Sequence, residues 1–281
     1  MKYTKLKITH WLSLLTGTVF CVLQTILYLR CYEEGVHLYN AGFTAYHAVY
    51  LALFAVMAAL FAVTVCGKPE HYPAEQGACG KSASFFALLS ALLLGAGAIH
   101  ALYILLQNGS MPSILRLIAM LLAFPAAFYF AVTAWVRQPR RCVLAFLCML
   151  VIIWASVYLM ACYFEMNISI NSPERVLRQM SLVALLLHTL YETRYLLEYP
   201  IPRLYFGTGC IAVILPLCAS LPDVIVTFMG HRAVSADTMF SMALSAISLY
   251  YFCRVGNTLS GPRARYAPEE SASGEENADR S

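Results

Sequence analysis

The residue types best suited to chemistry in this sequence gather in the segment LLLHTLYETRYLLEYP, which spans 185–200. His188 and Glu192 are four residues apart in it, so on a helix they lie on one face and a mutual hydrogen bond is feasible. An imidazole and a carboxylate can each take up and release a proton, and such groups inside a membrane helix mark substrate or proton paths. Three roles are open for the pair: structural hydrogen bonds between helices, a solvated cavity or proton path, and a zinc site, for which two ligands are too few.

A second candidate site surrounds Asp223, which directly follows Pro222. Pro222 and the nearby Pro216 have no N–H, so two backbone carbonyls lose their helical partners and a kink or break is favoured. A carboxylate beside freed carbonyls can bind a cation or a proton. The alternatives are a structural ion pair, with Arg116 or Arg178 as the partner at similar depth, and a solvated helix break.

Two histidines extend this second site toward a vestibule. His47 and His100 fall in the outer third of the segments that carry them. A lone histidine in a membrane helix is more often a packing residue, but together these polar groups indicate a vestibule that opens to the outside. Its expected members are His47, His100, Arg116, Glu165, Arg178 and Asp223.

The composition indicates the elements that must position these groups. The chain has 281 residues, of which 60% are hydrophobic and 12% are charged, whereas a soluble domain has roughly 45–50% and about 25%. The apolar residues form runs of roughly 20, the length of a helix that crosses a bilayer. We therefore predict an all-α, polytopic membrane helix bundle with eight transmembrane spans. Their expected ranges are 10–30, 43–66, 84–106, 114–136, 142–164, 177–197, 204–229 and 238–254.

The basic residues predict the orientation, because cytoplasmic segments attract Lys and Arg. With the N-terminus inside, the cytoplasmic side holds all but five of the 19 basic residues. The five on the outer side are Arg30, Arg116, Arg175, Arg178 and Arg232. Without the span at 177–197, Arg254 and the tail that follows it would lie outside. Both termini are therefore expected in the cytoplasm.

The chain divides into three parts by composition. Residues 1–9 form a cytoplasmic N-terminus, 10–256 the transmembrane bundle, and 257–281 a polar tail that is expected to be disordered and cytoplasmic. The first span resembles a signal peptide, but its length and the lack of a cleavage site indicate an uncleaved helix. None of the ten cysteines forms a CxxC pair. Cys31 and Cys162 fall near outer ends, so a disulfide between them is weakly supported.

These features favour a small-solute or cation-handling transporter or permease in the cell membrane, with Asp223 as the outer site and His188 and Glu192 as an inner titrating pair. The alternative is a membrane sensor or accessory subunit, which binds an external ligand and a cytoplasmic protein partner. An intramembrane enzyme ranks third, and neither a cofactor nor a metal is expected. The expected contacts are the lipid bilayer and a small solute or cation, with no nucleic acid.

Overall fold

The computed structural model describes residues 2–33, 38–39, 43–66, 79–108, 114–136, 141–164, 173–231 and 234–260, and within them the chain is helical apart from one short hairpin. The helices are α1 (Lys2–Cys31), α2 (Phe43–Val65), α3 (Lys81–Asn108), α4 (Ile114–Trp135), α5 (Arg141–Tyr163), α6 (Pro173–Leu196), α7 (Pro202–Phe228) and α8 (Ala236–Ser260). The strands β1 (Tyr32–Glu33) and β2 (Leu38–Tyr39) pair antiparallel between α1 and α2.

Seven of the described helices are long and apolar enough to cross a membrane. The remaining one, α6, has 24 residues but carries five charged side chains along its length. They are Glu174, Arg175, Arg178, Glu192 and Arg194. The prediction of an all-α chain with many membrane-length helices is thus confirmed, and α6 is the helix whose charges need partners inside the bundle.

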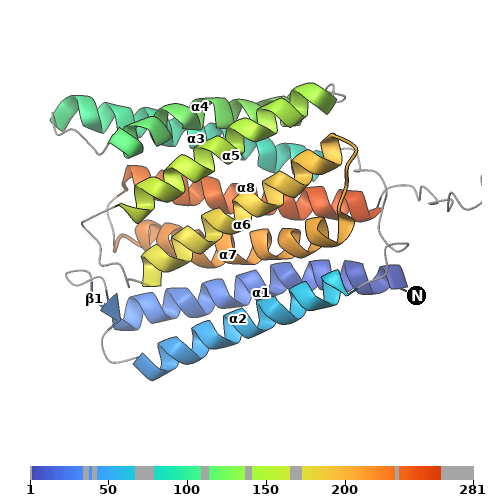
Figure 1. Cartoon of the computed structure of the whole chain (residues 1–281). Helices are drawn as coiled ribbons and strands as arrows, with labels where there is room; N and C mark the ends of the chain where they lie inside the picture. Colours follow the sequence, from blue (N-terminus) through green and yellow to red (C-terminus); the bar gives the residue numbers. More distant parts are fainter. Residues whose placement is uncertain are drawn as a thin grey trace, which may run out of the picture.

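Six helices form a closed ring of contacts. Each helix from α3 to α8 packs against the next one in the chain, and α3 packs against α8 to close the ring. α1 and α2 lie outside the ring, where both pack against α7 (Figure 1). In that view α3, α4 and α5 run along the upper side, α1 and α2 along the lower side, and α6, α7 and α8 between them. Short connections between antiparallel neighbours produce this order.

Aromatic side chains fill the middle of the ring. Trp154 of α5 is fully buried and its ring stacks on Tyr158, with a centroid distance of 5.8 Å. Tyr158 in turn contacts Phe240 of α8 across the ring, at 5.3 Å. On α3 the residues that face the core are mostly alanines, which allow close approach of the neighbouring helices. The ring is therefore packed rather than open at its centre.

The prolines of α7 do not break it. Pro216 and Pro222 lie inside one continuous helix, so of the expected kink or break, the break is wrong. Serines of α8 supply hydrogen bonds beside the prolines: Ser248 donates to the Val213 carbonyl at 2.8 Å, and Ser245 donates to the Ser220 hydroxyl at 3.2 Å. The α7–α8 interface thus carries two interhelical hydrogen bonds next to the proline-containing part of α7.

Helix α8 also differs from its expected range. It continues to Ser260, six residues beyond the expected end at Arg254. Arg254 therefore lies inside the helix and is buried, instead of ending a span at the membrane surface. The tail from 261 to 281 lies outside the described residues.

Replacing Trp154 with alanine should destabilise the fold strongly. The change removes a fully buried ring from the centre of the bundle, and a cavity of this kind costs about 3–5 kcal/mol. The free energy of unfolding can be measured by SDS titration in mixed micelles. The matched control is Phe146→Ala on the same helix, because the Phe146 side chain is 66% exposed and its loss should change stability by only about 0.5 kcal/mol. Equal losses in the two variants would contradict this description of the core.

Candidate functional site

The most deeply buried charged groups of the site are Glu192 and Arg254. Glu192 lies on α6 and Arg254 on α8, and the Arg254 Nε donates to Glu192 Oε1 at 3.4 Å. The two side chains are only 1% and 6% exposed. Both lie toward the end of the ring where α6 ends and α7 begins, which we call the α6–α7 end. The contact joins two helices that are not neighbours in the ring, so it crosses the interior.

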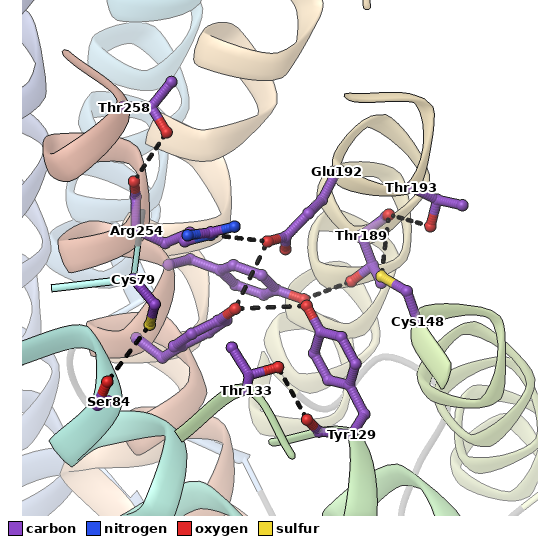
Figure 2. Close-up of polar contacts among 12 residues, drawn as sticks. Cys79, Ser84, Tyr129, Thr133, Cys148, Thr189, Glu192, Thr193, Arg254 and Thr258 are labelled. Atoms are coloured by element: carbon purple, nitrogen blue, oxygen red, sulfur yellow. Dashed lines mark hydrogen bonds and ion pairs between the residues drawn. The ribbon is translucent and has the colours of Figure 1, made fainter. Parts of the chain in front are cut away.

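Hydroxyl groups surround this ion pair (Figure 2). Tyr250 OH donates to Glu192 Oε1 at 3.5 Å and lies 3.3 Å from Tyr129 OH. Nearby, the Thr189 hydroxyl lies 2.6 Å from Tyr251 OH. We call these six residues the Glu192 cluster: Tyr129, Thr189, Glu192, Tyr250, Tyr251 and Arg254. The cluster draws its side chains from α4, α6 and α8, which converge in the ring interior.

Burial makes the Glu192–Arg254 pair expensive to keep. Removing two charges from water costs several kcal/mol per ion, and their attraction offsets this only when the geometry is good. Here the contact between Arg254 Nε and Glu192 Oε1 is near the upper limit of hydrogen-bond length. At the opposite end of the ring, by contrast, Arg116 Nη2 lies 2.5 and 2.6 Å from the two carboxylate oxygens of Asp237. A buried ion pair of this kind is by itself weak evidence for a role in stability.

His188 lies one helical turn from Glu192 but has a different set of neighbours. It is fully buried, and its Nδ1 is 3.4 Å from the Thr208 hydroxyl of α7. Its ring contacts Tyr205 and Tyr251, while its Nε2 is buried without a hydrogen-bond partner. Gly209 makes room for it, since a Cβ there would lie 3.1 Å from His188 Cε1.

The predicted inner pair is thus only partly assembled. His188 and Glu192 lie on the same region of α6, as expected, but His188 faces Thr208 of α7 whereas Glu192 faces Arg254 of α8. Four residues advance a helix by about 400°, so successive side chains at this spacing turn roughly 40° around the axis. In a crowded ring this rotation is sufficient to direct the two groups at different neighbours.

The other end of the ring carries a second charged layer. Arg116 of α4 pairs with Asp237 of α8, and Arg178 of α6 pairs with Glu174 at 3.2 Å. Arg116, Arg178 and Asp237 all lie near the starts of their helices, at the end of the ring opposite the α6–α7 end. Arg116 and Arg178 were expected as partners for Asp223, and the structure pairs them with these other carboxylates.

Asp223 is buried on α7, with 7% of its surface exposed. Its backbone carbonyl accepts a hydrogen bond from the Thr227 hydroxyl at 2.8 Å. Ser220, on the preceding turn, donates to the Pro216 carbonyl and accepts from Ser245 of α8. A carboxylate, hydroxyls and a proline-modified backbone are therefore close along one helix, as the sequence pattern indicated.

The remaining members of the expected vestibule are scattered. His47 is exposed on α2, which packs against α1 and α7, whereas Arg116 lies on α4 across the bundle from α2 (Figure 1). His100 lies on α3, and its Nε2 is buried without a hydrogen-bond partner. Glu165 lies outside the described residues. The structure thus separates His47 from the Arg116 layer.

Sequence reasoning missed Arg254, Tyr250 and Tyr129. Arg254 was counted as a basic residue of a cytoplasmic segment, because it follows the last apolar run. The signal that could have found it is its spacing from Tyr250, four residues earlier on what proves to be one helix. A buried Glu in a membrane helix also requires a cationic partner at similar depth.

Cysteines and metal-ligating groups are less informative. The Cys31 side chain is outside the described residues, so its pairing with Cys162, which is buried near the end of α5, stays a prediction. Among the residues that the structure describes, no group of three or more His, Cys, Asp or Glu side chains could hold a metal ion.

Removing the positive member of the inner pair should be costly. Arg254→Gln leaves the Glu192 carboxylate buried without its cation, and breaking such a pair costs about 3–5 kcal/mol of unfolding free energy. The double variant Glu192→Gln/Arg254→Gln removes both charges and should recover most of that loss. SDS titration of the two variants beside wild type measures the difference. If the double variant is as unstable as Arg254→Gln, the charges are not coupled as the structure indicates.

The role of the Glu192 cluster rests on its own contacts and charges. No family model, no curated protein and no solved structure matches this chain.

Proposed function

We propose that this chain is a small-solute or cation-handling transporter or permease of the cell membrane. The observation that carries the proposal is the pair of charged layers at the two ends of the α3–α8 ring. Glu192 and Arg254 join α6 to α8 at the α6–α7 end, and Arg116 and Asp237 join α4 to α8 at the other. The packed aromatic section of Trp154, Tyr158 and Phe240 lies between them.

This arrangement suits two gates that open in turn. Ion pairs across a pathway close it, and separation of the paired helices opens it. Because α8 contributes Asp237 to one pair and Arg254 to the other, a small tilt of α8 would weaken one contact while preserving the other. Alternating access of this kind is the usual mechanism of secondary transporters.

The buried Asp223 supports a coupling ion or proton in the same proposal. It lies on α7, the neighbour of α8, one turn from Ser220, which hydrogen-bonds Ser245 of α8. A change in occupancy or protonation at Asp223 would therefore act on the interface along which α8 moves. Carboxylates beside proline-modified helices are common sites for cations and protons in membrane proteins.

The proposed orientation places both termini in the cytoplasm, so the α6–α7 end faces inward. The basic residues Lys5, Lys7, Arg141, Arg194 and Arg203 gather at this end of the helices. An excess of Lys and Arg on the cytoplasmic side is the rule for multi-pass proteins. In this proposal α6 crosses the membrane like its neighbours, with its charges neutralised inside the ring.

The test is solute uptake by purified protein in proteoliposomes, with a panel of amino acids, organic acids and alkali cations. Asp223→Asn and Glu192→Gln should each reduce uptake of the accepted solute by about tenfold or more, which corresponds to roughly 1.4 kcal/mol of lost interaction. The matched control is Glu198→Gln, because Glu198 is an exposed carboxylate at the α6–α7 end and its loss should leave uptake unchanged.

Uptake that is the same in wild type, Asp223→Asn and Glu192→Gln would contradict the proposed mechanism. A chain that carries none of these solutes would instead favour the sensor or accessory-subunit alternative. That alternative is supported by the dense interior, in which Trp154, Tyr129 and Tyr250 are fully buried. A packed interior needs no pathway if the protein acts by binding a partner.

A further inference from the structure

We infer that the Glu192 cluster is an oxyanion-binding site, and that Glu192 itself occupies it in this structure. The ligand is a small anion with a carboxylate or phosphate group, which displaces the Glu192 carboxylate from Arg254. As a statement about the transported solute, the inference rests on the proposed function. As a statement about binding, it rests on the contacts alone.

Two donors from α8 converge on one oxygen of Glu192. Arg254 Nε and Tyr250 OH, four residues apart on that helix, both donate to Oε1, at 3.4 and 3.5 Å. Hydrogen bonds between a guanidinium and a carboxylate are normally shorter, about 2.7–2.9 Å. Both contacts are longer than that, so a ligand that is not tethered to α6 can approach the same two donors more closely than Glu192 does.

The charge balance also favours an anion. The hydrogen-bonded neighbours of the pair in the cluster are neutral hydroxyls, with Tyr129 and Tyr250 in contact with each other. When Glu192 takes up a proton and turns away from Arg254, the guanidinium remains as the only charge of the pair in a buried, weakly polarisable environment. An incoming anion restores the balance, whereas a cation at the same position would be repelled by Arg254.

The cluster lies near the α6–α7 end of the ring. Glu192 is four residues from the end of α6 at Leu196, and Arg254 is six residues from the end of α8 at Ser260. At 1.5 Å per residue these intervals are roughly 6 and 9 Å. Basic residues at the same end, including the exposed Lys5, would raise the local concentration of anions.

The experiment measures anion binding directly in detergent-purified protein. The probes are lactate, succinate and inorganic phosphate in equilibrium dialysis, with glycerol as the neutral control. In wild type, Glu192 competes with the anion for Arg254, which lowers the apparent affinity for the anion. Glu192→Gln removes this competitor and should therefore bind at least one of the three anions about tenfold more tightly than wild type. Preference for phosphate over the two carboxylates would distinguish the two kinds of ligand.

Two further variants control this measurement. Glu198→Gln makes the same chemical change in an exposed carboxylate, whose partner is Arg141, and should bind like wild type. Glu192→Gln/Arg254→Gln removes the proposed anion-binding cation and should lose the gain. If Glu192→Gln does not fold, Glu192→Asp serves in its place, since the shorter side chain withdraws the carboxylate from Arg254 and should also tighten binding.

The outcomes separate this inference from the proposed function. Tighter binding in Glu192→Gln that disappears in the double variant supports the oxyanion site, even if proteoliposomes show no uptake. The inference is overturned if none of the three anions binds Glu192→Gln more tightly than wild type, or if the double variant binds as well as Glu192→Gln. If uptake depends on Glu192 but none of the anions binds in this way, the transporter proposal is supported and the oxyanion site is contradicted.

Discussion

The contact between Glu192 and Arg254 is the constraint on which the interior of this bundle depends. A helix with the charges of α6 can be buried only if other helices bring partners of opposite sign to the same depth. α8 supplies Arg254, and the tyrosines around the pair supply further hydrogen-bonding groups. The order of the ring is compatible with this need, since α6 and α8 face each other across the interior with α7 beside both.

α8 has more roles than any other helix of the ring. It closes the ring against α3, hydrogen-bonds α7 through Ser245 and Ser248, and contributes one member of the charged pair at each end. Its small residues allow close packing, and its hydroxyls support the proline-containing backbone of α7. Helix packing, hydrogen bonds to α7 and both ion pairs therefore all involve α8. Its position should change when either the Glu192–Arg254 pair or the Arg116–Asp237 pair is broken.

The helices could be predicted from the sequence because runs of apolar residues and bilayer thickness determine them with little help from tertiary structure. The site could be predicted only in part. Glu192 and His188 were visible as ionisable residues in an apolar segment, but which neighbour each faces depends on helix order, which hydropathy does not encode. Arg254 was misplaced for a related reason: an arginine at the end of an apolar run resembles a loop residue unless its partner is known.

The pairing of α6 with α8 also has a consequence for the synthesis of the chain. Arg254 follows Glu192 by 62 residues, so on the ribosome the acidic helix is completed well before its cationic partner exists. Insertion scales assign about 2.5–3.5 kcal/mol to a charge at the centre of a membrane helix, and a carboxylate near the end of α6 would cost less than this. If α6 crosses the membrane as proposed, its insertion would become more stable when α8 is made, and chains that end before α8 would be less stable in the membrane.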